Sequence, residues 1–306
     1  MRNYSVLLLF APLFLFSNCK KEDPSKSEAN LQFKFKFDPN QIRLNNFGQP
    51  SSIPAGHAAQ TPEFHEMSVH YLELAPSAFT LLGTGAIVYK GEETTKGGEN
   101  AVDFDRVAKG GDDAVFAKIS LKNVPPGTYE WVRASVTYQN YDVRFNINNI
   151  PLIGNLSQQK GTVASFVGFN TYISSITPRS KTLTLNEDKK QGFWAFETNL
   201  SAPYEAYNQL YSGEAPAGAT TVVNPLFGSS PIPAGSCVVT GKFETPLVVT
   251  GNETEDLTVT LSFSINQSFE WMDSNGNGQL DIYADGVTPP EKIVDMGLRG
   301  LLPKWE

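Results

Sequence analysis

Apolar and polar residues alternate without a break along residues 31–38, which read LQFKFKFD. Leu31, Phe33, Phe35 and Phe37 would point to one face of a strand, and the residues between them to the other. This period is typical of a half-buried β-strand. The same pattern predicts strands over residues 65–75, 115–124, 129–147, 161–173, 181–186, 192–200, 237–249 and 256–271.

Helical patterns are scarce by comparison. No segment of helical length has a sustained apolar repeat at three and four residues, and only residues 203–215 and 291–302 could form short helices. Twenty-five glycines and 20 prolines divide the chain into short pieces with turn signals between them. These features predict an all-β fold, an antiparallel β-sandwich with long loops and a short helical segment near the C-terminus.

The domain would cover residues 31–306, either undivided or as two subdomains that separate near Asn148. Two stretches rich in Gly, Pro, Ser and Ala, residues 40–64 and 202–235, are expected to be long loops. Long ordered loops on a β scaffold are where binding surfaces tend to lie. A binding role through loops is therefore the first functional expectation.

The chain begins with one positive charge, Arg2, followed by an apolar run from Val6 to Phe16. This run has the length of the apolar core of a secretory signal and is too short to span a bilayer. Cys19 follows almost at once, and the segment resembles a bacterial lipoprotein signal with Cys19 as the lipidated residue. The resemblance implies a signal peptide over residues 1–18 and attachment to a membrane through Cys19. The alternatives are an ordinary signal peptide cut elsewhere and a short membrane anchor, because Asn18 stands where such signals have Gly or Ala.

Residues 19–30 are polar, densely charged and interrupted by Pro24, which predicts a solvated tether. Lys21, Glu22 and Asp23 resemble the export signal of surface-exposed lipoproteins of Bacteroidetes. That resemblance implies an outer-membrane lipoprotein at the cell surface; a position that faces the periplasm is the alternative. In both cases the expected location is the cell envelope.

Cys237 is the only cysteine besides Cys19, so an internal disulfide is not expected and stability must come from packing. The formal net charge is −8, and no basic cluster exceeds two adjacent residues. This charge pattern argues against nucleic acid and anionic lipid as partners. A glycan or another envelope protein is the expected partner.

One loop carries a pattern of oxygen ligands. Residues 272–285 read MDSNGNGQLDIYAD and place side-chain oxygens at near-alternate positions around Gly278. Calcium binds six to eight oxygens, and in EF-hand loops these come from positions 1, 3, 5, 7 and 9, with Gly at position 6. The loop resembles those of dockerin modules and other EF-hand-like calcium repeats. The resemblance implies these ligands: Asp273, Asn275, Asn277, Gln279 through its backbone carbonyl, and Asp281.

Position 12 of such a loop usually holds an acid, but here it is Ala284. The closing carboxylate would have to come from Asp285, the first candidate, or from Glu291 or Asp295. A loop without its bidentate ligand is expected to bind calcium with a dissociation constant of about 10⁻⁴ to 10⁻³ M. The ion would have a structural role, pinning the C-terminal segment to the strands. The alternative is a metal-free Asn/Gly turn whose amides bond to their own backbone.

Copper is the less favoured cofactor. His65 and Met67 would share one face of a strand, and an imidazole with a thioether suits copper. His70 would face the opposite side. The first 140 residues or so also resemble, faintly, the MbnP-like family of periplasmic copper-binding β proteins, on the strand FHEMSVHYLEL and the stretch VFAKISLKNVPPGTY. The resemblance implies a copper-handling protein, but none of that family's metal ligands can be matched to this sequence residue by residue.

Motifs typical of hydrolases, metalloproteases or phosphate-binding loops are missing from the sequence. The favoured hypothesis is therefore an exported, lipid-anchored envelope protein without catalytic activity, stabilised by one calcium ion. A copper-handling periplasmic protein is the second hypothesis. A glycan-acting hydrolase with an unrecognised pair of acids is the third.

Overall fold

The computed structural model describes residues 28–45, 47–215, 230–233 and 235–306. Within these ranges the chain forms β-strands and three short 3-10 helices, η1 (Phe104–Arg106), η2 (Leu121–Asn123) and η3 (Glu205–Tyr207), but no α-helix. The prediction of an all-β fold is confirmed. No helix in the part of the chain that is described is long and apolar enough to cross a membrane. The predicted signal peptide (residues 1–18) and Cys19, the predicted lipidation site, lie outside the described residues.

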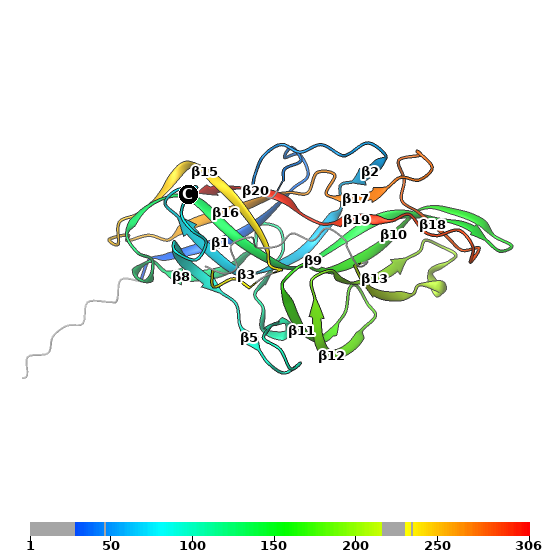
Figure 1. Ribbon diagram of the computed structural model, residues 1–306, viewed down its shortest axis with the longest axis horizontal. Helices are drawn as coiled ribbons and strands as arrows, with labels where there is room; N and C mark the ends of the chain where they lie inside the picture. Colours follow the sequence, from blue (N-terminus) through cyan, green and yellow to red (C-terminus); the bar gives the residue numbers. More distant parts are fainter. Residues whose placement is uncertain (1–27, 46, 216–229, 234) are drawn as a thin grey trace, which may run out of the picture.

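The strands form four sheets (Figure 1). The first has the order β20 (Arg299–Trp305), β16 (Leu257–Ser264), β1 (Asn30–Asp38), β8 (Val115–Ser120). The second and largest has the order β14 (Leu210–Glu214), β13 (Phe193–Asn199), β10 (Gly154–Phe166), β9 (Gly127–Ile150), β3 (Glu63–Ala75), β4 (Ala86–Lys90). Three further strands join it: β15 (Cys237–Val249) and β18 (Asp281–Tyr283) on β9, and β7 (Lys109–Gly110) on β3.

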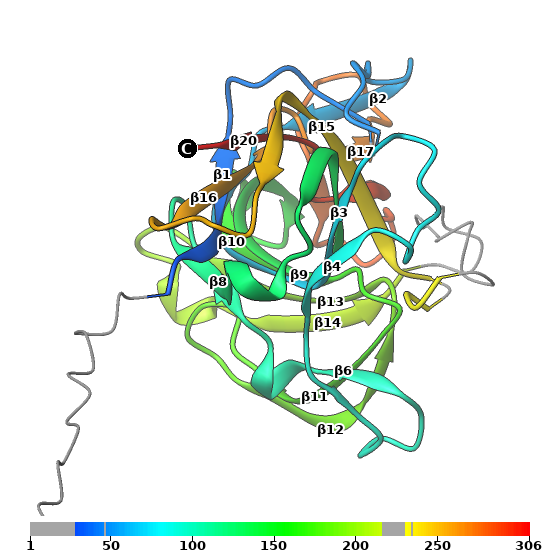
Figure 2. The same ribbon diagram turned by 90° about the vertical axis from the view of Figure 1, so that its left-hand side faces the viewer.

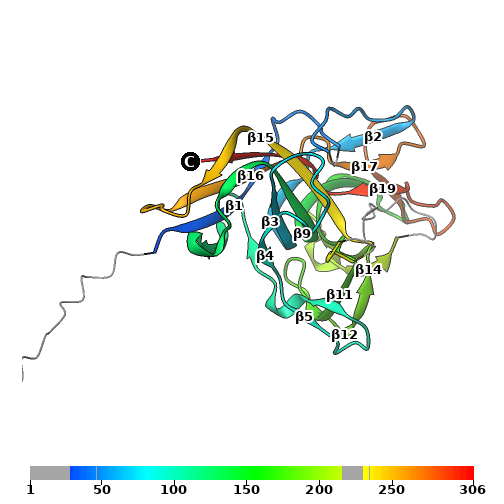
Figure 3. The ribbon, with the colours of Figure 1, turned by 60° about the vertical axis from the view of Figure 1, so that its left-hand side comes forward.

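Two smaller sheets complete the fold (Figures 2 and 3). One has the order β12 (Leu183–Lys190), β11 (Asn170–Ile176), β6 (Ala101–Asp103), β5 (Glu93–Thr94). The other has the order β19 (Ile293–Met296), β17 (Phe269–Met272), β2 (His57–Gln60). Most pairs are antiparallel, as expected, but β1–β16, β6–β11 and β9–β18 are parallel.

The main core lies between the first sheet and the large sheet. Along β1 the burial alternates as the sequence predicts, with Leu31, Phe33, Phe35 and Phe37 buried. They pack in one cluster with residues of β3, β9, β15 and β16, such as Leu261. Burial of a large apolar side chain contributes about 1.5–3 kcal/mol, so this aromatic and aliphatic layer supplies much of the driving force for folding.

The prediction of a short helical segment near the C-terminus is wrong. Residues 291–302 run instead through β19 and into β20, which pairs antiparallel with β16 from Val259–Trp305 to Ser264–Arg299. Leu301 is fully buried, whereas its neighbour Leu302 is 37% exposed. Adjacent residues that face opposite sides are typical of a strand, and the free edge of β16 provides the backbone partners that favour it over a helix.

Strand β9 organises the molecule. Its 24 residues pair with β3 from the first half of the chain and with β10, β15 and β18 from the second half. The strand runs through Asn148, where a subdomain division was considered. At its far end β9 turns into β10, and β18 lies beside it there (Figure 1). This end of the large sheet carries the candidate metal site.

Candidate metal centre

The loop that resembles a calcium site connects β17 to β18. β17 ends at Met272 and β18 begins at Asp281, which lies opposite Asn146 of β9 in a parallel pair. The backbone of Asn146 also donates to the carbonyl of Leu280 at 2.8 Å. The loop is therefore fixed at both ends: by β17, which is paired with β2 and β19, and by β9.

Asp273 organises the winding of the loop. Its carboxylate accepts backbone N–H groups from Gly276 and Gly278 at 2.8 Å and from Asn277 at 3.2 Å. Gly276 and Gly278 have φ values of +72° and +71°, in the left-handed region that glycine adopts without strain. Gly278 was expected at the sharp turn of the loop, and the structure places a turn with left-handed backbone there.

The side chains of the loop converge on Asp281. Asn275 and Asn277 each donate an amide N–H to its Oδ2 at 2.7 Å. Asn146 and Asn148 of β9 donate to its Oδ1 at 2.9 and 2.8 Å. One buried carboxylate thus accepts four amide hydrogen bonds, two from the loop and two from the sheet.

The environment of Asp281 favours the ionised form. Burial alone would raise the pKa of this carboxyl. The hydrogen bonds from Asn146, Asn275, Asn148 and Asn277 outweigh burial and lower the pKa below its usual value of 3.8. Asp281 therefore remains negatively charged at neutral pH, and four side-chain amides donate hydrogen bonds to its carboxylate.

Glu291 closes the loop. Its Oε1 accepts the backbone N–H and the hydroxyl of Ser274 at 2.8 and 3.0 Å, and its Oε2 accepts the backbone N–H of Asp281 at 3.0 Å. Glu291 is buried and comes from the segment between β18 and β19. A third carboxylate therefore lies across the start and the end of the loop.

The remaining candidates lie apart from this set. Asp285 accepts hydrogen bonds from the backbone of Val287 and Thr288 at 2.9 and 2.8 Å and from the Asn149 amide at 2.8 Å, so it caps the following turn. These bonds, with Thr288 and Val287 first, lower the pKa of Asp285. Asp295 lies in β19 opposite Glu270. The structure therefore brings Glu291 to the closing position, and neither Asp285 nor Asp295.

The Gln279 side chain faces the sheet instead of the loop. Its Oε1 accepts hydrogen bonds from Asn146 at 2.8 Å and from Gln158 of β10 at 3.0 Å. The sequence hypothesis assigned only the backbone carbonyl of Gln279 to the ion, so the two observations are compatible. The side chain adds a second connection between the loop and the β9–β10 hairpin.

The chemistry of this set fits calcium. Asp273, Asp281 and Glu291 are acids, and hard oxygen ligands are what calcium prefers. The Oδ1 atoms of Asn275 and Asn277 accept the backbone N–H groups two residues further on, at 3.0 and 2.7 Å, as in a metal-free Asn/Gly turn. Each amide would therefore have to rotate before its oxygen could reach a cation beside Asp281. Among the described residues no three His, Cys, Asp or Glu side chains come together as a metal-binding group. The acids alone therefore do not form a site, and a cation here would need them together with amide and backbone oxygens, which calcium accepts and copper or zinc does not favour.

Three residues of the site were not predicted from the sequence: Asn146, Asn148 and Ser274. Asn146 and Asn148 stand two apart on β9, so both point to one face. An Asn pair at this spacing was a visible signal. The partner of the pair was not visible, because Asp281 is more than 130 positions away along the chain.

The histidine and methionine considered for copper do not form a site. Met67 is fully buried in the main core, whereas His65 is on the surface with its Nε2 3.1 Å from Asp142 Oδ1. This hydrogen bond raises the pKa of His65. His70 is buried and its Nε2 lies 2.9 Å from Glu93 Oε1. The three side chains therefore have separate environments.

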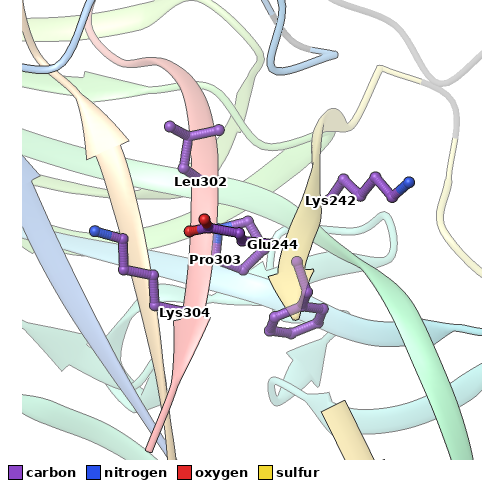
Figure 4. Close-up of a pocket in the computed structure, with 6 residues that line it drawn as sticks. Lys242, Glu244, Leu302, Pro303 and Lys304 are labelled. Carbon is purple, nitrogen blue, oxygen red and sulfur yellow. The ribbon is translucent and has the colours of Figure 1, made fainter. Parts of the chain in front are cut away.

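An open groove of about 660 Å³ lies on the described surface and is lined by residues of β1 and β3 and by Asp112, with Lys36 and Glu63 among them. A second groove, of about 310 Å³ between β15 and β20, is lined by Lys242, Phe243, Glu244, Leu302, Pro303 and Lys304 (Figure 4). The Lys242 and Lys304 side chains point away to opposite sides, so the polar groups do not converge (Figure 4). The groove has none of the clustered acids and bases that an active site requires.

Comparison with family models, with curated proteins and with solved structures finds no match for this chain.

Proposed function

We propose that this chain is an exported, lipid-anchored β-sandwich protein of the cell envelope, with a binding or structural role and one calcium ion in the loop 273–281. The proposal of a calcium ion rests on one observation: the side-chain amides of Asn275 and Asn277 both lie 2.7 Å from Oδ2 of Asp281. Rotation of the two amides would place their oxygens beside those of Asp281, and calcium-binding loops place oxygens around one centre.

In the proposed site, Asp273, Asp281 and Glu291 would hold the ion together with the amide oxygens of Asn275 and Asn277 and the carbonyl of Gln279. Calcium would supply a positive charge that offsets three neighbouring carboxylates. The residues of the chain would do the rest: Asn146 and Asn148 orient Asp281, and Ser274 orients Glu291. The role is structural, because the ion would fix the segment after β18 against β9.

The proposal of a lipid anchor rests on the sequence around Cys19 and on the polar tether that follows it. The first strand of the sandwich begins at Asn30, the last residue of the predicted tether of residues 19–30. Export to the cell envelope also suits a loop with low expected affinity, because calcium outside the cytoplasm reaches the concentrations that such loops require.

Metal analysis of the chain purified without a chelator tests the calcium part. We expect about one calcium per chain after dialysis against millimolar calcium, and much less in Asp273→Asn. Copper in place of calcium, or equal calcium in both proteins, would overturn the proposal of a calcium ion.

Metabolic labelling with a fatty acid tests the proposed lipid anchor: the wild-type chain should take up label and Cys19→Ser should not. Equal labelling of the two would contradict acylation at Cys19.

A further inference from the structure

An aliphatic residue with a left-handed backbone conformation lies at the turn of the β9–β10 hairpin. Leu152, at the tip, is fully exposed, and its neighbour Ile153 is 47% exposed. Leu152 has a φ of +67°, a left-handed conformation in which a residue other than Gly, Asn or Asp is uncommon. Neither backbone preference nor solvation by water accounts for a leucine here. Such outliers concentrate where a surface is used.

A second exposed aliphatic residue lies beside this tip. Val287 is 87% exposed in the turn that Asp285 caps. Asp285 also accepts the amide N–H of Asn149 at 2.8 Å, and the backbone of Ala284 donates to the carbonyl of Asn148 at 2.8 Å. The two turns are therefore linked through the end of β9, and their exposed aliphatic residues Leu152, Ile153 and Val287 are called the distal tip.

The distal tip lies far from the N-terminal end of the domain. β9 begins at Gly127, a few residues after Leu121, whose backbone N–H donates to Ala29 at 2.9 Å. A strand rises by about 3.3 Å per residue, so the 24 residues of β9 span at most about 75 Å. Figure 1 shows the first described residues and the hairpin tip at opposite ends of the long axis. A nine-residue tether between Cys19 and Ala29 reaches about 30 Å at most.

The size and charge of the distal tip indicate which kind of partner it can bind. Three aliphatic side chains offer roughly 200–350 Å² of apolar surface, well below the ~800 Å² per partner of a stable protein interface. Residues 149–158 contain no charged side chain, and Asp285 is engaged in capping its turn. A small, uncharged, aliphatic projection with polar amides behind it suits insertion into the outer part of a lipid bilayer, where burial of each side chain is favourable and no charge has to be desolvated.

We propose that the distal tip inserts into an electrically neutral lipid surface and gives the protein a second membrane contact, at the opposite end from its N-terminal tether. The inference deepens the proposed function: the calcium loop, through Asn146, Asn148 and β18, holds the Val287 turn beside the Leu152 turn. Removal of calcium should weaken lipid binding because the two tips would no longer be held together.

Site-specific fluorescence on vesicles tests the proposal. The full chain carries Cys19→Ser and Cys237→Ala, so that no lipid is attached and a single engineered cysteine is labelled with a polarity-sensitive dye. Pro289→Cys places the dye next to the tip, and Thr254→Cys places it in the exposed loop between β15 and β16. Phosphatidylcholine vesicles with nitroxide-labelled lipid should quench and blue-shift the Pro289→Cys dye and leave the Thr254→Cys dye unchanged. Equal responses at the two positions would overturn the proposal.

A pair of variants tests the side chains. The double variant Leu152→Asn/Val287→Ser should reduce vesicle binding of the Pro289→Cys protein at least tenfold. Its fold should be retained, because Asn tolerates the left-handed φ of position 152. The matched control is Phe79→Ser with Leu81→Asn, which removes side chains that are 93% and 55% exposed elsewhere. Equal loss in both variants, or a dimer that the tip variant abolishes, would overturn lipid insertion.

The failure of either proposal can be recognised separately. If calcium raises the melting temperature but the Pro289→Cys dye stays in water, the calcium site stands and the lipid contact is refuted. If the dye is quenched equally in calcium and in chelator, the lipid contact stands and its link to calcium is refuted.

Discussion

Glu291 and Asp281 form two hydrogen bonds with one another, and each residue donates one of them. Oε2 of Glu291 accepts the backbone N–H of Asp281 at 3.0 Å, and the backbone N–H of Glu291 donates to the carbonyl of Asp281 at 3.0 Å. The other oxygen of Glu291 binds Ser274 at the start of the loop. The segment after β18 therefore returns and closes the loop with an acid that lies ten positions beyond Asp281 in the sequence.

This geometry predicts which acid matters for calcium. Glu291→Gln should raise the apparent calcium dissociation constant by about tenfold or more, because a bidentate acidic ligand is the main determinant of affinity in such loops. The measurement is the calcium dependence of the melting temperature. Asp285→Asn is the matched control and should change the constant less than twofold, since Asp285 caps the turn at Val287 and Thr288. A larger effect of Asp285→Asn than of Glu291→Gln would refute the assignment.

The pKa of Asp281 predicts acid sensitivity. Its pKa is lowered in the folded state, so the stability that it contributes is present above the unfolded value of about 3.9 and is lost as the pH falls through the folded value. In chelator, the free energy of unfolding should therefore fall steeply below about pH 4. Asp281→Asn should be less stable at pH 7, because one carbonyl oxygen cannot accept four amides, and should show a shallower acid slope. Parallel pH profiles of variant and wild type would contradict this account.

His65 and Asp142 predict an effect of opposite sign. The hydrogen bond to Asp142 raises the pKa of His65 above 6.5, so its contribution is complete below the unfolded value and is lost as the pH rises through the folded value. His65→Gln should be less stable than wild type at pH 5–6, by less than about 1 kcal/mol because the pair is partly exposed, and equal to it at high pH. Chemical denaturation across this pH range measures the difference. A deficit that grows with pH would exclude the mechanism.

The C-terminal strand is tested by two adjacent leucines. Leu301→Ala should lower the free energy of unfolding by about 2–5 kcal/mol, because Leu301 is fully buried against the main core. Leu302→Ala should cost less than about 1 kcal/mol, since Leu302 is partly exposed. Denaturant unfolding of the two variants gives the comparison. Similar losses in both would argue against a strand at this position.

The periodicity of the sequence was sufficient for the class of fold and for most strands. Alternation along residues 31–38 identified both the strand and its buried face, because side chains alternate across a strand whatever its partners are. The partners themselves were not predictable. β1 pairs with β16, more than 220 positions away, and nothing local in either strand encodes a parallel pair. The C-terminal segment was misassigned for the same reason, since its strand depends on the edge of β16.

The candidate site was predictable only in its local part. The near-alternate oxygens of Asp273, Asn275, Asn277 and Asp281 indicated a loop that could surround a centre, and the structure brings Asn275, Asn277 and Asp281 together. The Asn pair of β9 was missed because the register between β9 and β18 is a tertiary property. Glu291 was only one of three candidates, because sequence distance does not reveal which acid returns to the loop.

Thermal unfolding during a calcium titration tests the central claim most directly. With a dissociation constant of about 10⁻⁴ to 10⁻³ M, 10 mM calcium should stabilise the wild-type chain by about 1–3 kcal/mol, a shift of a few degrees in melting temperature. Asp273→Asn, which keeps one acceptor oxygen for the loop but loses the charge, should show little or no shift. A wild-type melting temperature that does not respond to calcium, or an equal response in Asp273→Asn, would contradict a calcium site in this loop.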